Sequence, residues 1–144
     1  MSDRRQRLFV AVPVPEATLP AVQRAQDSLP PVPGLRLLRP EQLHVTLAFI
    51  GEVGDDEAQA ARAVMLDLGR RPCGEGRIEE FLLLPSPRKA RVVTLAIEDL
   101  DGMFASLFEE IMVGLEGAGV MQREKRPFLP HLTIARLRDP GPVV

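Results

Sequence analysis

The sequence predicts a mixed fold in which helices and strands alternate along the chain. Three observations lead to this prediction: short runs rich in Val and Phe, two long segments with apolar residues at helical spacing, and breaks rich in Pro and Gly between them. This interleaving favours an α+β class or a layered α/β class. A length of 144 residues suits one compact domain or two small lobes that share a core.

The first half of the chain is expected to hold three strands and two helices. The strand that begins at His44 alternates apolar side chains, and we expect Gly51 to close it. Pro20 falls inside the first helical segment, where it is tolerated if it lies in the first turn. An acidic start and Pro72 beyond the end delimit the second helix. The predicted ranges are strands at 7–13, 35–39 and 44–50 and helices at 15–29 and 55–71.

The second half is expected to hold two joined strands, a helix and a last strand. A Pro-Ser-Pro-Arg turn at 85–88 joins two apolar runs. The following helix has a continuous apolar face from Leu100 to Leu115, and the acidic residues at 98–101 stand near its start, where the helix dipole favours them. The predicted ranges are strands at 78–84, 92–97 and 131–137 and a helix at 100–115.

Composition and charge exclude several classes of protein. No apolar run approaches the roughly 18 to 20 residues of a membrane-spanning helix, and the run at 8–12 is too short for a signal peptide core. The single cysteine, Cys73, excludes an intrachain disulfide and offers no metal cluster. A net charge of −2 argues against a protein that coats long nucleic acid. We therefore expect a cytoplasmic protein that does not bind membranes, and a monomer.

Basic residues are concentrated in three clusters although the whole chain is slightly acidic. The simpler interpretation of these clusters is that they are ordinary solvated surface charges. The functional interpretation is a locally basic cleft, which would suit a short anionic ligand or one RNA end better than a duplex. The clusters are Arg4, Arg5 and Arg7; Arg88, Lys89 and Arg91; and Arg123, Lys125 and Arg126, with Arg36, Arg39, Arg136 and Arg138 beside the segments described next.

A short motif occurs twice in the sequence. The segment that starts at His44 reads HVTLAF, and the segment that starts at His131 reads HLTIAR. The chain contains only two histidines and four threonines, yet each histidine has a threonine two positions later, Thr46 in the first copy and Thr133 in the second. Residues i and i+2 of a strand point to the same face, roughly 6.5 Å apart. Each copy therefore places an imidazole beside a hydroxyl.

This pair of motifs suits acid–base chemistry on a phosphodiester. A neutral imidazole can take a proton from attacking water, and a protonated imidazole can give one to the departing ribose oxygen. Histidine's ordinary pKa of about 6.5 allows both forms near neutral pH. The threonine hydroxyls would hydrogen-bond the non-bridging oxygens, and a nearby arginine could hold the growing charge.

The histidines allow two other interpretations. A single histidine at the start of a strand is more often a structural residue with satisfied hydrogen bonds, but its recurrence in matched segments argues against this. A metal site is the second alternative, to which Glu41 could contribute. Two histidines without a nearby cysteine or paired carboxylates fall short of the usual three or four ligands, so we expect no metal.

At these residues the sequence resembles the two-histidine phosphoesterase superfamily. Within it, the sequence resembles the RNA 2′,3′-cyclic phosphodiesterases, also called 2′-5′ RNA ligases. The resemblance covers most of the chain and includes RLFVA at 7–11, PEQLHVTLAFIG at 40–51 and PHLTIAR at 130–136. It implies an α+β fold and one bilobal phosphoesterase domain over residues 1–144, with two pseudo-symmetric sheet-plus-helix lobes that flank a central groove.

The resemblance also implies an activity and roles for individual residues. The activity is hydrolysis of a terminal RNA 2′,3′-cyclic phosphate to a 2′-phosphate, without metal or cofactor. His44 would be the general acid that protonates the 3′ oxygen, and His131 the general base that activates water. Thr46 and Thr133 would bind the phosphate, and Arg136 would be a further phosphate contact.

Two alternative functions stay open at this point. Within the same chemistry, the substrate could be another cyclic or 2′-5′-linked nucleotide, or the protein could join RNA by the reverse reaction as a 2′-5′ RNA ligase. From a different class, the chain could be a non-catalytic module that binds RNA ends or nucleotides. In each case the expected partner is an RNA 3′ end or a short nucleotide with a cyclic phosphate.

Overall fold

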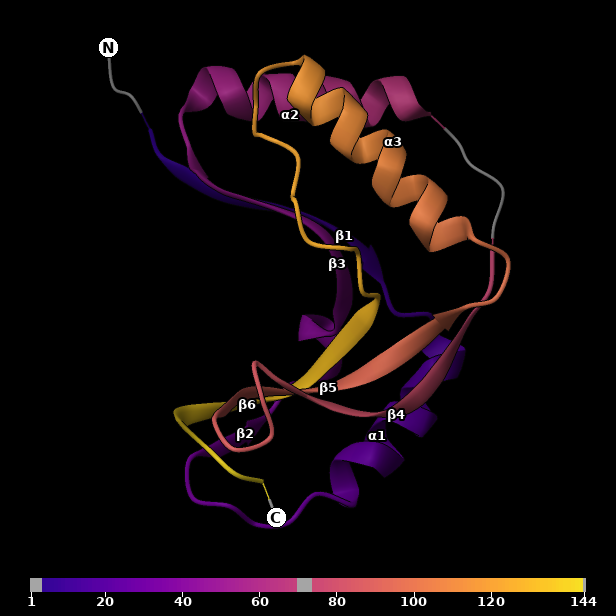
Figure 1. Ribbon diagram of the computed structural model, residues 1–144, viewed down its shortest axis with the longest axis vertical. Coiled ribbons are helices and arrows are strands. Elements are labelled where there is room, and N and C mark those ends of the chain that lie inside the picture. Colours follow the sequence, from indigo (N-terminus) through magenta and orange to yellow (C-terminus); the bar gives the residue numbers. More distant parts are fainter. Residues whose placement is uncertain (1–3, 70–73, 144) are drawn as a thin grey trace. The chain divides into compact units, whose positions relative to one another are not determined.

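The computed structural model describes residues 4–69 and 74–143 (Figure 1). Cys73 and Pro72 lie outside these residues. The elements, in order, are β1 (Gln6–Pro13), η1 (Glu16–Thr18), α1 (Leu19–Asp27), β2 (Leu35–Leu37), η2 (Pro40–Gln42), β3 (His44–Val53), α2 (Asp55–Leu68), β4 (Gly76–Leu84), β5 (Ala90–Asp99), α3 (Met103–Gly117) and β6 (His131–Gly141), where η denotes a 3₁₀ turn.

The strands form two sheets. One contains β1 and β3, and the other contains four strands in the order β2-β6-β5-β4. Strand β6 pairs antiparallel with both β2 and β5. Because a layered α/β fold is built on parallel strands joined by crossover helices, this antiparallel pairing decides between the two predicted classes. The α+β class is confirmed.

The chain folds into two compact units, each built from three segments. Unit 1 contains residues 1–11, 46–77 and 99–130. Unit 2 contains residues 12–45, 78–98 and 131–144. The two-stranded sheet with α2 and α3 belongs to unit 1, and the four-stranded sheet with α1 belongs to unit 2, apart from the strand ends that cross from one unit to the other.

Two helices make the core of unit 1. Figure 1 shows α2 and α3 lying side by side, and their contact is very close. A Cβ atom added at Gly114 of α3 would meet Cγ1 of Val64 of α2 at 2.5 Å, so only glycine allows this approach. Ala58 of α2 and Ile111 of α3 are buried. The glycine at position 114 thus allows the two helices to approach this closely.

One helix covers one face of the four-stranded sheet in unit 2. Helix α1 contacts β6 and buries Val22 completely. Pro20 is the second residue of α1, where a missing backbone N–H costs no hydrogen bond. The expectation that Pro20 lies in the first turn is confirmed. The Nε2 group of Gln26 donates to the backbone carbonyls of Leu38 at 2.8 Å and Ile134 at 3.0 Å, and so fastens α1 to the sheet.

Two predicted element ends are wrong for reasons of backbone conformation. Gly51 does not close its strand, because β3 continues to Val53. Gly51 has a φ of 86°, and a glycine in this conformation can bend a strand without ending it. Helix α2 ends at Leu68, earlier than predicted, where Gly69 has a φ of 61°. The predicted end, Arg71, lies outside the described residues.

The start of α3 also differs from the prediction. The helix begins at Met103 and not at Leu100, which is 42% exposed. The carboxylate of Asp99 accepts hydrogen bonds from the backbone N–H groups of Phe104 at 3.1 Å and Ala105 at 2.9 Å. An aspartate that caps N–H groups in this way stands before the helix and not inside it. Within the described residues, no helix is long and apolar enough to cross a membrane.

Candidate active site

Both copies of the His-x-Thr motif begin a strand. His44 is the first residue of β3, and His131 is the first residue of β6. In both strands the histidine and the threonine are partly exposed, and the residue between them is buried. The prediction that each motif presents an imidazole and a hydroxyl on one face of a strand agrees with this alternation.

The likeness of the two strands extends beyond the motif. In each, the first six residues follow the same order: partly exposed, buried, partly exposed, buried, buried, exposed. Strict alternation would not bury two consecutive residues, here Leu47 and Ala48 in β3 and Ile134 and Ala135 in β6. The repeat in the sequence is therefore also a repeat in local structure.

A β-bulge explains the pair of buried residues in β6. In the pairing with β5, Thr133 lies opposite Thr94 and Ala135 lies opposite Val93, so Ile134 has no partner on β5. Such an extra residue reverses the alternation that follows it. The Ile134 carbonyl accepts hydrogen bonds from the Leu38 backbone N–H at 2.9 Å and from Gln26. The carbonyl of the bulge residue is thus fully bonded.

The bulge decides the direction of Arg136. Residues 131 and 136 are five positions apart and would point to opposite faces of a regular strand. With one bulge between them, Arg136 joins His131 and Thr133 on the more exposed face of β6, while Leu132 and Ile134 are buried on the opposite face. The structure therefore brings together three of the predicted site residues, His131, Thr133 and Arg136, on one face of β6.

The first motif occupies a different sheet. His44 and Thr46 lie on β3, which pairs with β1. His44 belongs to unit 2, the same compact unit as His131, whereas the part of β3 from Thr46 onward belongs to unit 1. The position that corresponds to Arg136 is occupied in β3 by Phe49, which is 72% exposed. The two copies therefore differ in the side chain that follows the motif, an apolar ring in one and a cation in the other.

The neighbours of the second motif on β5 are small. Ala96 lies opposite His131, and Thr94 lies opposite Thr133. Residues opposite one another on adjacent strands share a face of the sheet. A methyl group beside the imidazole leaves room for a ligand, whereas a large side chain at position 96 would cover it.

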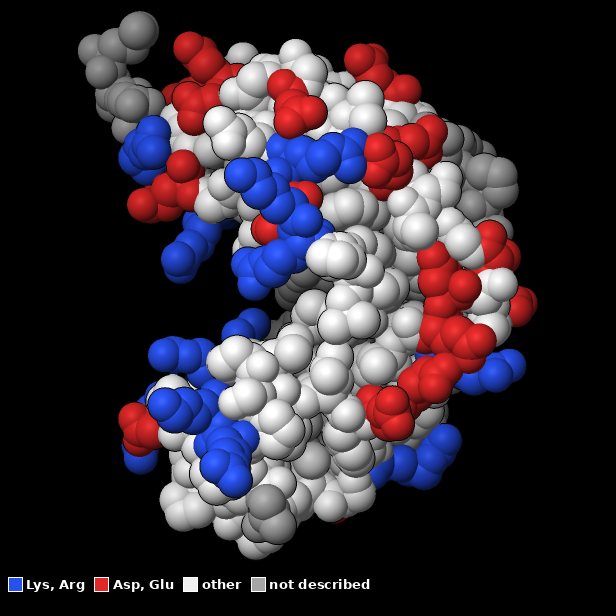
Figure 2. Space-filling model, in the orientation of Figure 1, with Lys and Arg blue, Asp and Glu red and all other residues white. Residues whose placement is uncertain are grey.

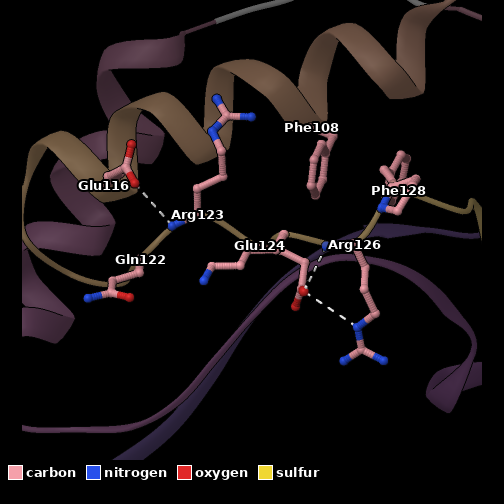
Figure 3. Close-up of a pocket in the computed structure, with 9 residues that line it drawn as sticks. Phe108, Glu116, Gln122, Arg123, Glu124, Arg126 and Phe128 are labelled. Carbon is pink, nitrogen blue, oxygen red and sulfur yellow. Dashed lines mark hydrogen bonds and ion pairs between the residues drawn. The ribbon is translucent and has the colours of Figure 1, made fainter.

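A pocket with a volume of about 710 Å³ lies within unit 1 (Figure 3). It lies between α3 and the segment that leads into β6. The rings of Phe108 and Phe128 stack with centroids 4.5 Å apart and an interplanar angle of 10°, which holds this segment against α3. The lining residues are Phe108, Glu116, Gln122, Arg123, Glu124, Lys125, Arg126, Pro127 and Phe128.

The arginines of this pocket are paired with neighbouring carboxylates. Arg123 donates two hydrogen bonds to Glu109, one of them at 2.8 Å, and this contact lowers the pKa of the Glu109 carboxyl and raises the pKa of Arg123. Arg126 pairs with Glu124 at 3.5 Å. For this basic cluster, the interpretation as ordinary surface charge is favoured, because two of its three cations already have acidic partners.

Two contributors to the site region were not singled out from the sequence. Gln26 is one polar residue among several on α1, and nothing in the local pattern marks it as a hydrogen-bond partner of Ile134. Arg36 was noted only as a flanking cation, but its strand pairs with β6 beside Arg136. Within the described residues, no group of three or more His, Cys, Asp or Glu is placed to hold a metal ion.

Comparison with known proteins identifies the family. The sequence profile described as LigT like Phosphoesterase matches residues 12–94, more than half of the chain. A protein from Methanothermobacter thermautotrophicus, named RNA 2′,3′-cyclic phosphodiesterase, is 33% identical over 137 residues, which cover 93% of this chain and 72% of that protein. This similarity extends over nearly the whole chain.

Solved structures agree with this result. The crystal structure of a Thermus thermophilus protein superposes on this chain with a TM-score of 0.81 at 32% sequence identity. The match covers 96% of this chain and 78% of the Thermus thermophilus chain. The structure of E. coli LigT with 3′-AMP superposes with a TM-score of 0.76 at 26% identity, over 98% of this chain and 77% of its own. The resemblance deduced from the paired motifs is confirmed, and the chain belongs to the LigT-like phosphoesterase family.

Proposed function

We propose that this chain hydrolyses the 2′,3′-cyclic phosphate at the 3′ end of an RNA to a 2′-phosphate. The proposal is supported mainly by the His-x-Thr motif that begins both β3 and β6, with the same burial pattern in the two strands. Relatives that are 33% identical and matched over most of the chain are named RNA 2′,3′-cyclic phosphodiesterase, which supports the substrate class. E. coli LigT, solved with 3′-AMP, supports the binding of a nucleotide.

The proposed reaction needs one acid and one base. Water attacks the phosphorus atom, and the bond between phosphorus and the 3′ oxygen breaks. The imidazole of His131 accepts a proton from the water, and the imidazolium of His44 donates a proton to the departing 3′ oxygen. The products are a 2′-phosphate and a 3′ hydroxyl, and exchange of protons with solvent restores both histidines.

The hydroxyls and the arginine are proposed to stabilise the phosphate. Thr46 and Thr133 donate hydrogen bonds to its non-bridging oxygens, which carry more negative charge in the transition state than in the cyclic ester. Arg136 shares the exposed face of β6 with His131 and Thr133 and adds a positive charge on that face. Its guanidinium can donate two parallel hydrogen bonds to a phosphate.

Replacement of either histidine tests the acid–base roles. We expect His44→Ala and His131→Ala each to lower kcat on a short RNA with a cyclic phosphate end by about 10² to 10⁴. The double variant should lose less than the product of the two single losses, because the two groups act in one step. Normal turnover by His131→Ala, with its folding confirmed by circular dichroism, would contradict the assignment.

The pH dependence and the products test the reaction class. A bell-shaped profile of kcat/KM, with one limb lost in each histidine variant, is expected for a general base and a general acid that act in one step. The product RNA should end in a 2′-phosphate. A joined 2′-5′ product would support the ligase alternative, and complete loss of turnover in a chelator would overturn the proposed metal-free reaction.

A binding assay distinguishes an enzyme from a binding module. A non-catalytic module would bind the cyclic-phosphate RNA tightly and in a salt-dependent manner without turnover. The same RNA should therefore be followed both by fluorescence anisotropy, to measure Kd, and by mass spectrometry, to detect hydrolysis.

A further inference from the structure

A group of basic residues stands at the turn between β4 and β5, residues 85–89. Between Glu80 and Glu98 the sequence contains no acidic residue, and its cations in this stretch are Arg88, Lys89 and Arg91. All three are exposed. Figure 2 shows Lys and Arg side chains gathered over the end of unit 2 where this turn and the end of β6 lie. The turn thus forms a local positive surface on a slightly acidic chain.

The cations of the turn are not neutralised by carboxylates. Among the residues that the structure describes, the side chains of Arg88 and Lys89 make no ion pair and no hydrogen bond. In the pocket of unit 1, by contrast, Arg123 and Arg126 already have carboxylates as partners. An exposed cation without a partner keeps all of its donors for an anion. For the cluster at the turn, the interpretation as a binding surface is therefore favoured over ordinary surface charge.

The backbone of the turn is restrained. Pro85 and Pro87 fix two of its φ angles. The hydroxyl oxygen of Ser86 accepts a hydrogen bond from the backbone N–H of Lys89 at 3.3 Å. Ala90, which follows the turn, begins β5 and is completely buried. A restrained and exposed segment loses little conformational entropy on binding, so its cations are suited to hold a flexible polyanion.

Strand β5 connects this turn directly to the second motif. Ala90 lies opposite Gly141, the last residue of β6. Ala96 lies opposite His131, the first residue of β6. Lys89 precedes Ala96 by seven residues, which corresponds to about 20 Å of strand. All of these residues lie in unit 2, so the four-stranded sheet itself relates the turn to the motif.

We propose that Arg88 and Lys89 bind backbone phosphates of the RNA about three to four nucleotides before its cyclic end, a length similar to the smallest single-strand binding sites. His131, Thr133 and Arg136 stay at the reacting phosphate, and the RNA extends from them along the sheet to the turn. Contacts to backbone phosphates position a strand without reading its sequence. The preferred substrate is thus an RNA of several nucleotides, and the turn sets this preference for length.

This inference rests on the proposed function, because it locates the cyclic phosphate at His131 and Thr133. Two substrates separate the two ideas, a dinucleotide and a hexanucleotide that both end in the same nucleoside cyclic phosphate. Only the hexanucleotide is long enough to reach the turn. The measurement is the ratio of kcat/KM for the hexanucleotide to kcat/KM for the dinucleotide, and we expect the wild type to prefer the hexanucleotide.

Replacement of the two cations tests the contact. We expect Arg88→Gln and Lys89→Gln each to lower the ratio about 2- to 5-fold, and the double variant about 5- to 20-fold, because exposed charge pairs are individually weak. For the hexanucleotide, the slope of log kcat/KM against log salt should become shallower by about 1.4 in the double variant, because two fewer phosphates are neutralised. The value of kcat/KM for the dinucleotide should not change.

Arg91→Gln is the matched control. Val92 lies opposite Arg136 and shares its face of the sheet, so Arg91, the preceding residue of β5, points to the other face. This variant removes the same charge from the same segment, and we expect it to leave the substrate ratio unchanged. Lys89→Arg keeps the charge and should also keep the ratio. An equal loss in Arg91→Gln would show an effect of net charge alone and would contradict the proposed contact.

The outcomes are distinguishable from failure of the proposed function. An unchanged ratio in the double variant, with both substrates hydrolysed by the wild type, would overturn the inference and leave the proposed function intact. If this variant also lost binding to vesicles of phosphatidylserine and phosphatidylcholine, the turn would belong to a lipid-binding surface and not to an RNA site.

If the wild type hydrolyses neither substrate, the proposed function fails. The turn is then tested by the Kd of a hexanucleotide that ends in a 2′-phosphate, measured by fluorescence anisotropy. This Kd should rise in the double variant of Arg88 and Lys89 and not in Arg91→Gln. Equal Kd values in all three proteins would overturn the inference.

Discussion

Two threonines that lie opposite one another in the sheet have different surroundings. Thr94 of β5 is fully buried, and its hydroxyl donates a hydrogen bond to the carbonyl of Leu82 at 2.7 Å. Thr133 of β6 is partly exposed and lies two residues after His131. The same side chain therefore joins two strands in one case and faces the proposed phosphate site in the other.

Replacement of each of these threonines by valine should separate stability from activity. Thr94→Val removes a buried hydrogen bond and leaves a carbonyl with one bond fewer, so we expect the free energy of unfolding to fall by about 1 to 2 kcal/mol. Thr133→Val removes a proposed donor to the transition state, so we expect kcat to fall about 10- to 100-fold with little change in stability. Urea titration and steady-state kinetics measure the two effects.

Thr18 provides the control for both variants. It precedes α1, and its side chain makes no capping hydrogen bond. Thr18→Val should leave both stability and kcat close to the wild-type values. The interpretation would be wrong if Thr133→Val lost stability and activity in proportion, because the hydroxyl would then act through folding.

At the residue scale, the local sequence was sufficient to predict the two His-x-Thr motifs, but it was not sufficient to predict the position of Arg136. The two histidines and their threonines could be predicted to share a strand face because residues i and i+2 follow directly from strand geometry. Arg136 could be proposed only by resemblance. Its position on the same face of β6 as His131 and Thr133 depends on the bulge at Ile134, and no local sequence pattern indicates that bulge.

At the scale of elements, the bulge in β6 depends on a neighbouring helix. Ile134 has no partner on β5, and its carbonyl is bonded instead by the Leu38 backbone N–H and the Gln26 side chain. A bulge leaves one residue outside the regular ladder, so its polar groups need other partners. Gln26 of α1 supplies one of them from a position 108 residues away in the sequence.

Replacement of Gln26 should therefore weaken this part of the fold. We expect Gln26→Met to lower the free energy of unfolding by about 1 to 2 kcal/mol, because the shape is kept and two hydrogen bonds are lost. The Leu38 amide, which donates to the same carbonyl, should exchange faster with solvent. Gln23→Met is the control, since Gln23 is exposed on the same helix; equal effects of the two changes would refute the role of Gln26.

The types of the elements could be predicted better than their ends. Periodicity depends on residues close in sequence, so every strand and helix described above had been expected at nearly its place. The ends depend on caps and on glycine conformation. Asp99 acts as a cap before α3, and Gly51 bends β3 without ending it. A sequence pattern alone does not distinguish an acidic cap from an acidic first turn.

At the scale of the whole molecule, the chain passes repeatedly between the two units. The crossings lie between residues 11 and 12, 45 and 46, 77 and 78, 98 and 99, and 130 and 131. The first four of these crossings lie within β1, β3, β4 and β5, and the last lies at the start of β6. Loss of one unit would therefore unravel strands that continue into the other, so neither unit is a segment that can be cut out.

We expect the two units to unfold in a single transition, as small single domains usually do. The probes are already present in the chain. The imidazole proton signals of His44 and His131 report on unit 2, and the methyl signals of Met65, Met103 and Met112 report on unit 1. Both sets of NMR signals should disappear at the same urea concentration. Separate midpoints would show that the units are independent.

Several expectations about the whole protein stay predictions. These are the single bilobal domain over residues 1–144 with a central groove, the monomeric state and the cytoplasmic location. The fold class and the family, by contrast, are confirmed by the antiparallel sheet and by the relatives matched over most of the chain.

The sequence by itself determined the order and type of the elements, the paired motifs and, through them, the family. All of these depend on patterns within a few residues, which side-chain spacing and local turn residues encode. The tertiary structure decided that Arg136 shares a face with His131 and that Arg36 lies opposite it. Those positions depend on a bulge and on the pairing of β2 with β6, which joins strands about a hundred residues apart in the sequence. Hydrogen bonds between such distant segments form only in the folded chain, and local sequence does not specify them.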